Sequence, residues 1–302
     1  MTFVIEEKDD GKLLRTFLRE RGVSAALTTK LKQRKDGMMI GGVRITVRAV
    51  LHKGDVLTLG VEETEAPLHV LPRDLPLDVL LRTPDFAVLN KSANMPTHPS
   101  HGHFEDTLAN ALVYHFSTED APFRPRFVNR LDRNTTGVVL VAMHPISAAA
   151  LSQSMAEGKI EKTYLALVHG ELHESRVIRT GVRRREQSII FREVCEIGKG
   201  DFAETCMTPL ATNGELTLVH LTPRTGRTHQ LRVHMAHIGH PLLGDDLYGV
   251  ADGFPRHALH AATLRFPFGE EDVFVRAPLP KDMYDVIADM GEEVLSLAQN
   301  GN

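Results

Sequence analysis

Residues 127–142 read FVNRLDRNTTGVVLVA and divide into two halves of different character. The first half is polar and charged, and it places Asp132 between Arg130 and Arg133. From Gly137 onward, Val, Leu and Ala predict a buried β-strand. A charged loop held by a rigid strand commonly positions a catalytic group, yet an Asp beside Arg and Asn is more often a turn residue or a cap. Taken alone, the stretch favours a structural role for Asp132 and leaves a catalytic role open.

The overall composition is that of an ordinary globular protein. Of the 302 residues, 42% are hydrophobic and 25% are charged, and the formal net charge is -4. This length is sufficient for two domains. Cys195 and Cys206 are too few for a disulfide framework and lack the CxxC spacing of a zinc site, so a reduced, cytoplasmic setting is expected. The N-terminus has no signal-peptide pattern, and no run reaches the roughly 18–20 apolar residues of a membrane span.

Residues 1–62 are predicted to form a small α+β domain. The spacing of apolar residues predicts a helix over Lys12–Arg21, which Gly22 ends. Ser24 is a suitable N-cap for a second helix over Ala25–Lys35. A hairpin and a final strand are predicted from three further segments, residues 38–40, 43–46 and 56–59.

This N-terminal segment carries a large excess of positive charge. Between Lys12 and Lys53, eleven Lys or Arg residues are set against two acids, Glu20 and Asp36, which leaves a local charge of +9. A solvated protein surface normally mixes charges of both signs. The excess therefore indicates a surface for the phosphate backbone of a nucleic acid. The residues expected to contact RNA are Lys12, Arg15, Lys30, Lys32, Arg34, Lys35 and Arg44.

The remainder of the chain is predicted to be a linker followed by one larger domain. Residues 63–75 are acidic and then proline-bearing, which is typical of a linker, and the second domain is assigned to residues 76–302. Its predicted helices are 107–115, 147–155, one within 224–237, and 281–298. Its predicted strands are 77–81, 86–91, 137–142, 163–168, 177–182, 188–194, 203–210, 216–222, 259–266 and 273–277.

Histidines in two stretches raise the alternative of a metal-dependent hydrolase. His98, His101 and His103 lie in a loop broken by Pro and Gly, while His234 and His237 share one face of a predicted helix. No cysteine accompanies the first stretch, and the second lacks the glutamate of an HExxH motif. We therefore predict no metal site.

Several motifs resemble those of the RluA-type pseudouridine synthases, and they occur in that family's order. Residues 129–137, NRLDRNTTG, are similar to the family's His-Arg-Leu-Asp-x-x-Thr-Ser-Gly motif. The other matching segments are 90–91 with 97–99, 162–170 and 224–249. Two departures are visible, because Asn129 replaces the usual histidine and Ser92 replaces the usual proline after Lys91. The N-terminal domain resembles the αL-motif RNA-binding domain, although its glycine turn is reduced to Gly41-Gly42.

This resemblance implies a fold, a reaction and a set of site residues. The fold would be α+β, with a central mixed, largely antiparallel sheet flanked by helices and loops. The reaction would be the cofactor-free isomerisation of uridine in RNA, with Asp132 acting at the ribose C1′ as a nucleophile or as a base. Arg232 would pair with Asp132, and Arg130 would help to flip the nucleotide out of the RNA. Tyr164 would pack on the base, and a part in proton transfer is left open for it. Apolar walls are expected from Leu231 and Leu259.

The resemblance also implies a partner and leaves one alternative function. The partner would be a structured RNA, with 23S ribosomal RNA favoured and transfer RNA next, and no membrane or obligate protein partner is implied. The alternative is a non-catalytic RNA-binding or ribosome-assembly protein that keeps the same fold. The presence together of Asp132, Tyr164 and Arg232 argues against that alternative.

Overall fold

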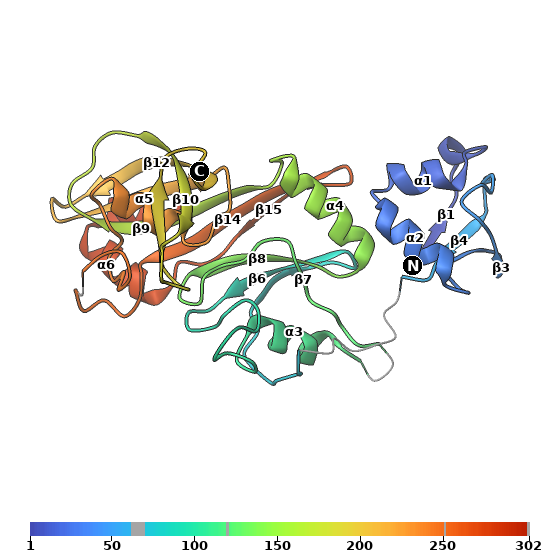
Figure 1. Ribbon diagram of the computed structural model, residues 1–302, viewed down its shortest axis with the longest axis horizontal. Helices are drawn as coiled ribbons and strands as arrows, with labels where there is room; N and C mark the ends of the chain where they lie inside the picture. Colours follow the sequence, from blue (N-terminus) through green and yellow to red (C-terminus); the bar gives the residue numbers. More distant parts are fainter. Residues whose placement is uncertain (62–69, 119–120, 251, 301–302) are drawn as a thin grey trace.

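The computed structural model describes residues 1–302 except 62–69, 119–120, 251 and 301–302 (Figure 1). Most of the predicted linker, 63–75, therefore lies outside the described residues. The described strands form two sheets, one of four strands near the N-terminus and one of eleven strands. No helix among the described residues is long and apolar enough to cross a membrane.

The small sheet and two helices enclose an apolar cluster of their own. The sheet has the order β1-β4-β2-β3, and all of its pairings are antiparallel. Ser24 caps the second helix as predicted, because its Oγ accepts a hydrogen bond from the backbone N–H of Leu27 at 3.1 Å. The elements of this part are β1 (Thr2–Val4), the 3-10 helix η1 (Glu7–Asp9), α1 (Leu14–Glu20), α2 (Ala25–Gln33), β2 (Met38–Ile40), β3 (Val43–Arg44) and β4 (Val56–Leu59).

One helix of the larger part, α4 (Pro145–Ala156), lies between the large sheet and the N-terminal lobe (Figure 1). Its Ile146 is buried within the apolar cluster of the N-terminal lobe. A Cβ added at Gly22, just after α1, would lie 3.2 Å from Ala150 Cβ, so the two parts touch closely here. On its other side α4 contributes Leu151 to the main core. The helix thus joins the two apolar cores.

The large sheet has the order β11-β10-β12-β13-β9-β14-β8-β6-β5, with β15 paired to β14 and β7 to β8. Every described pairing in it is antiparallel except that of β8 with β14, which is parallel. Its strands are β5 (Val79–Arg82), β6 (Phe86–Lys91), β7 (Arg126–Phe127), β8 (Thr136–Ala142), β9 (Glu161–His169), β10 (Arg176–Arg184), β11 (Arg192–Cys195), β12 (Asp201–Thr212), β13 (Leu216–Pro223), β14 (Leu259–Phe268) and β15 (Glu271–Arg276).

The helices of this part cover the sheet on both faces. Along β9, Tyr164 and Ala166 join the main core while Leu165 and Leu167 join a second cluster, as the two-residue period of a strand requires. Leu108 packs against the main core and Met283 against the second cluster. The remaining helices are α3 (Leu108–Phe116), α5 (Gln230–His237), α6 (Lys281–Asp289) and α7 (Glu292–Asn300). The predicted α+β class with a mixed, largely antiparallel sheet is confirmed.

Two predicted elements, the strand over 188–194 and the C-terminal helix, were wrong in extent, each for a local reason. The strand expected over 188–194 is reduced to β11, because Ser188 Oγ accepts hydrogen bonds from two following backbone N–H groups and forms a turn. The helix predicted within 224–237 is present, and it begins at Gln230, after a turn. The single C-terminal helix is two helices, separated at Gly291, whose φ of 126° lies outside the helical region.

The parallel pairing of β8 with β14 is short and depends on a glycine. It joins His260 to Thr136 and Ala261 to Gly137. Gly137 has a φ of 109°, and a Cβ there would lie 2.1 Å from the backbone oxygen of Ala261. Ala261 is also paired with Tyr164 on β9, so these three residues lie in one row across three strands. The absence of a side chain at Gly137 therefore allows the strands beside Asp132 to approach one another.

We predict that Gly137→Ala lowers the free energy of unfolding by about 3 kcal/mol or more, because it combines backbone strain with overpacking. Gly198→Ala is the matched control, since Gly198 has a similar φ of 95° but nothing lies within 4 Å of its added Cβ. The control should lose only the strain contribution, about 1 kcal/mol. Guanidinium denaturation of both variants measures the difference, and equal losses would contradict this account of Gly137.

Candidate active site

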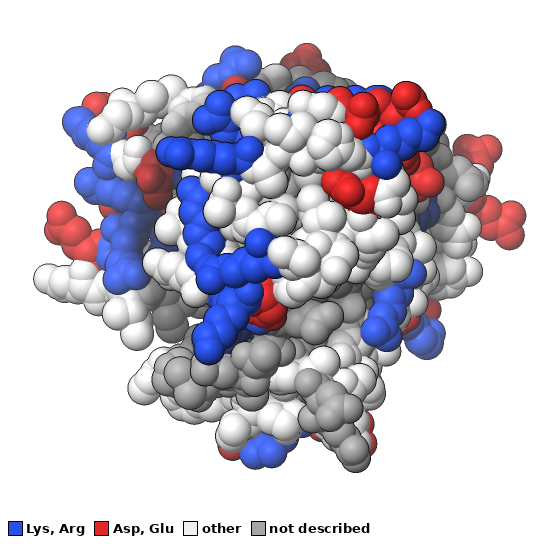
Figure 2. All heavy atoms as spheres, turned by 90° about the vertical axis from the view of Figure 1, so that its right-hand side faces the viewer, with Lys and Arg blue, Asp and Glu red and all other residues white. Residues whose placement is uncertain are grey.

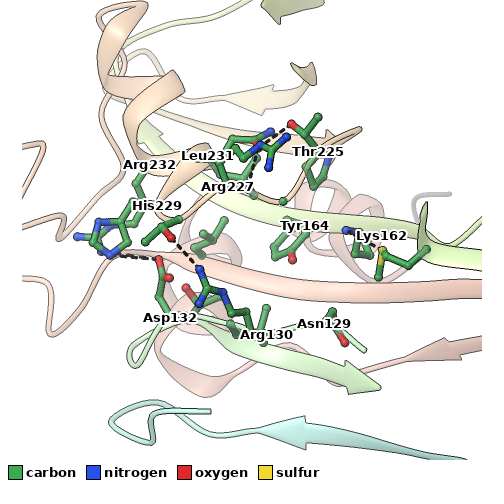
Figure 3. A pocket seen from close by; sticks show the side chains of 18 of the residues that line it. Asn129, Arg130, Asp132, Lys162, Tyr164, Thr225, Arg227, His229, Leu231 and Arg232 are labelled. Atoms are coloured by element: carbon green, nitrogen blue, oxygen red, sulfur yellow. Dashed lines mark hydrogen bonds and ion pairs between the residues drawn. The ribbon is translucent and has the colours of Figure 1, made fainter. Parts of the chain in front are cut away.

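A cavity of about 580 Å³ opens above the seam between β8, β14 and β9. Three segments distant in sequence supply most of its lining, as Figure 3 shows. Asp132 and Arg130 come from the loop before β8, Tyr164 and Lys162 from β9, and His229 with its neighbours from the start of α5. The cavity thus brings together residues of all four segments on which the sequence prediction rested, since His98 also lines it.

The backbone of the Asp132 loop is fixed by buried side chains. Thr97 Oγ1 donates to the carbonyl of Leu131 at 2.8 Å and accepts from its N–H at 3.2 Å. Lys91 Nζ donates to the carbonyl of Arg133 at 2.9 Å. Because these contacts hold the residues on either side of Asp132, its carboxylate projects from a rigid backbone into the cavity.

The end of this loop is held in the same way by the segment before β14. Arg256 donates to the carbonyl of Asn134 at 3.1 Å and is itself held by a bidentate ion pair with Asp282 of α6. The next two residues, Thr135 and Thr136, place their hydroxyls 2.9 Å from His257 Nε2 and from His260 Nδ1, respectively. Helix α6 therefore helps to position the loop, a role that no pattern in the sequence indicates.

Lys91 is the most deeply buried of these supports. It is 1% exposed, at the end of β6, and its ammonium also donates to the carbonyls of Ser92 and Met95, both at 2.8 Å. Three carbonyl oxygens match the three donors of one ammonium group. Burial lowers the pKa of Lys91 to about 7, against the attraction of Asp132. The ammonium therefore joins the 92–95 loop to the loop that carries Asp132.

Arg232 lies beside Asp132, but its main partner is another carboxylate. Its Nη1 is 3.9 Å from Asp132 Oδ2, whereas its Nε and Nη2 donate to both oxygens of Asp245 at 2.8 and 2.6 Å. Both Arg232 and Asp245 are buried. The expected pairing of Arg232 with Asp132 is therefore present as an ion pair, while Asp245, a fully buried carboxylate that the sequence did not predict as a partner, takes the planar fork of the guanidinium.

Tyr164 lies on the floor of the cavity, 8% exposed. Burial, with a further contribution from the charge of Asp132, raises the pKa of Tyr164 well above its ordinary value of 10.0. The hydroxyl therefore stays protonated near neutral pH. Leu231 and Leu259, both buried, line the same cavity. Arg130 lies at the exposed rim, where its Nη2 donates to Thr228 Oγ1 at 2.7 Å.

Asn129, one of the two departures from the family motif, has a structural role. Its Nδ2 donates to the carbonyl of Val138 at 3.2 Å, and its Oδ1 accepts from the N–H of Leu140 at 2.7 Å. Both polar atoms of the side chain therefore pair with the backbone of β8. Ser92, the other departure, supplies one of the carbonyl oxygens that bind Lys91.

His229 is a cavity residue that sequence reasoning did not select. Its backbone is left-handed, with φ 57°, immediately before α5. Nδ1 lies 2.8 Å from Tyr248 Oη, and Nε2 lies 4.0 Å from Asp132 Oδ2. Burial lowers the pKa of His229. A left-handed residue other than glycine in a cavity is a structural signal of function, and the sequence does not reveal it.

The histidines considered for a metal are engaged elsewhere or lie apart. Both ring nitrogens of His234 are 2.9 Å from threonine hydroxyls, those of Thr180 and Thr205. His103 pairs with Asp106 outside the cavity. Across the part of the chain that the structure describes, no three His, Cys, Asp or Glu side chains are grouped so as to hold a metal ion.

The positive N-terminal surface is partly neutralised by acidic side chains. One of them, Asp9, precedes the segment Lys12–Lys53 over which the charge was counted. Lys12 pairs with Asp9 as well as Glu20, and Arg34 pairs with Asp36. Arg44 donates to a backbone carbonyl, that of Lys32. Figure 2, which views this end of the molecule, shows a band of Lys and Arg side chains down one side. The expected RNA contacts that are exposed and form no ion pair with any described residue are Arg15, Lys30, Lys32 and Lys35.

Comparison with known proteins identifies relatives over nearly the whole chain. Residues 85–237 match the model of the family described as RNA pseudouridylate synthase. An uncharacterized RNA pseudouridine synthase of Bacillus subtilis, YjbO, is 35% identical, covering 89% of this chain and 95% of the relative. A ribosomal large subunit pseudouridine synthase D of Xylella fastidiosa is 32% identical, covering 85% and 82%. Among solved structures, human RNA pseudouridylate synthase domain containing 1 has 31% identity and a TM-score of 0.55, covering 67% and 83%.

We predict that the buried Lys91 makes stability depend on pH. An unfolded lysine titrates near 10.5 and the folded one near 7, so the unfolded state binds more protons between these values. The free energy of unfolding of the wild type, relative to Lys91→Met, should therefore rise with pH from 7 to 10, by at most about 1.4 kcal/mol per pH unit. Denaturation at several pH values tests this, with Lys159→Met as the exposed control. A flat or falling difference would contradict the prediction.

Proposed function

The chain belongs to the RNA pseudouridine synthase family, and we propose that it converts specific uridines of 23S ribosomal RNA to pseudouridine, with Asp132 as the catalytic carboxylate. The family's reaction is the isomerisation of uridine in RNA, and the proposal adds the target RNA and the catalytic residue. The observation that carries the assignment of the site is the convergence of Asp132, Tyr164 and Arg232 on one cavity.

The reaction leaves the composition of the nucleotide unchanged. The bond between the ribose C1′ and N1 of uracil breaks, a bond from C1′ to C5 forms, and one hydrogen leaves C5 while another is gained at N1. A carboxylate beside C1′ either attacks that carbon or removes a proton from the sugar. Asp132 is suited to both routes, because its rigid loop directs the carboxylate into the cavity beside the Arg232 guanidinium.

Tyr164 is proposed to support the uracil ring and not to remove a proton. Its raised pKa, caused first by burial, makes the phenolate a scarce species at neutral pH. The ring lines the cavity together with Leu231 and Leu259 and provides a flat apolar surface for a flipped base. The rim residue Arg130 would contact the RNA from which the nucleotide is removed.

Ribosomal RNA is proposed as the target on two grounds. Several relatives bear the name ribosomal large subunit pseudouridine synthase D, from Xylella fastidiosa and Zymomonas mobilis among others. We also assign residues 1–62 as an αL-motif RNA-binding domain, whose exposed cations suit a large structured RNA. Mapping pseudouridine in total RNA from cells with and without the protein tests the target. If cells without the protein lack pseudouridines in transfer RNA alone, the target is transfer RNA and not ribosomal RNA.

Asp132→Asn should lower the rate of tritium release from C5-labelled uridine in RNA by on the order of 10⁴-fold or more. The neutral amide can act neither as nucleophile nor as base. RNA binding should persist. Asp246→Asn is the matched control, since Asp246 is an exposed carboxylate 3.6 Å from the same Arg232. Turnover that survives in Asp132→Asn would refute the catalytic assignment and favour a non-catalytic RNA-binding protein.

Replacing Lys30, Lys32 and Lys35 together by Gln should weaken RNA binding and reduce its salt dependence. For each lysine that binds a phosphate in the wild type, the slope of log K against log salt should fall by about 0.7–0.9. The control replaces three exposed lysines that already have acidic partners, Lys159, Lys199 and Lys281. Affinity titrations from low to high salt measure both slopes. An unchanged slope in the first variant would exclude these lysines from the RNA surface.

A further inference from the structure

Lys162 is a positively charged side chain in the cavity wall that has no acidic partner among the described residues. The only polar contact of its ammonium among those residues is the sulfur of Met155, at 3.8 Å. Burial lowers the pKa of Lys162, and no neighbouring charge opposes the shift. A partly buried cation without a counter-charge is unfavourable in the empty protein. Such a residue is suited to a ligand that brings negative charge.

The position of Lys162 relative to the other cavity residues is defined by β9. Lys162 and Tyr164 are two residues apart on one strand, so their side chains lie on the same face, as Figure 3 shows. In Figure 3, Tyr164 lies between Asp132 and Lys162. Lys162 is therefore on the side of Tyr164 away from Asp132. A uracil ring that rests on Tyr164, with its sugar at Asp132, has its far edge toward Lys162.

That far edge carries the oxygens on which charge develops. When the bond between C1′ and N1 breaks, its electron pair stays on the base, and the resulting anion is delocalised over N1, O2 and O4. The same pair then forms the bond from C5 to C1′. A hydrogen-bond donor placed where this charge develops stabilises the transition state more than the ground state.

We propose that Lys162 forms a subsite for a carbonyl oxygen of uracil and stabilises the detached uracil anion by donating a hydrogen bond to it. No proton is transferred in this contact, and the ammonium remains charged throughout. The inference rests on the proposed roles of Asp132 and Tyr164, and it adds a group that recognises the base.

The symmetry of uracil makes this subsite useful both before and after the ring turns. Rotation about the axis through N3 and C6 exchanges N1 with C5 and, at the same time, O2 with O4. A donor that binds one carbonyl oxygen before the rotation therefore meets the other afterwards. Cytosine carries an amino group in place of O4, which offers the ammonium no acceptor. The subsite would thus favour uracil over cytosine.

A phosphate of the RNA backbone is the other anion that Lys162 could meet, and kinetics separate the two. A phosphate contact would contribute to affinity and to its salt dependence without affecting the chemical step. A contact with the uracil anion would affect the chemical step and leave affinity almost unchanged. The probe is ribosomal RNA labelled with tritium at uridine C5 and taken from cells that lack the protein.

The experiment measures single-turnover tritium release with enzyme in excess. For Lys162→Met we expect the maximal rate constant to fall by on the order of 10²-fold, while the half-saturating enzyme concentration changes less than about twofold. Lys162→Arg should retain most of the rate, because it keeps a charged donor. Lys159→Met is the matched control, a surface lysine paired with Glu157, and should behave as the wild type.

A second variant guards against a folding defect. In Lys162→Ala the rate should be partly restored by added propylammonium, which replaces the missing side chain, and not by propanol. An unchanged maximal rate in Lys162→Met, or a raised half-saturating concentration with a flatter salt slope, would overturn the proposal. Its failure is separate from that of the proposed function, because Asp132→Asn would then still be inactive while Lys162→Met turned over normally.

Discussion

The site depends on a single buried ammonium group. Lys91 comes from β6 and binds three carbonyl oxygens, those of Ser92, Met95 and Arg133, which belong to two different loops. Without the Lys91 side chain, these oxygens would face one another in an apolar interior with no donor, which is unfavourable for each group. The requirement to satisfy them fixes the distance between the loops. Asp132 is adjacent to one of the bound carbonyls, so its position follows from the satisfaction of backbone groups and not from any contact of its own side chain.

A comparable constraint acts in the large sheet. Antiparallel strands build most of it, and a short parallel contact between β8 and β14 joins its two parts. Gly137 permits that contact, and the row through Ala261 then sets Tyr164 opposite the loop that carries Asp132. The two residues are distant in sequence and come from different motifs. They share a cavity because one position in the seam has no side chain.

Much of this could be predicted from the sequence. The features that could not be predicted have one cause in common. The strand after Asp132, the Ser24 cap and the mixed sheet follow from local patterns or from family motifs. The second and closer acidic partner of Arg232 was missed, because the motif does not show that Asp245 would be buried beside it. The positive charge that Lys12 offers to RNA was overestimated for a similar reason. Its partner Asp9 lies outside residues 12–53, over which the charges were counted. The left-handed His229 and the Arg256 contact with Asn134 also arise only from tertiary packing.

The arrangement of Arg232 bears directly on the proposed chemistry. Had its guanidinium formed a bidentate bridge with Asp132, both carboxylate oxygens would be engaged in two short hydrogen bonds. Asp245 takes that geometry instead, and Asp132 remains 3.9 Å away. The positive charge still acts across this distance in a partly enclosed cavity, where water screens it less than in solution. Asp132 therefore keeps a cation beside it and lone pairs available to the cavity, a combination that a carboxylate needs if it is to attack a carbon or accept a proton.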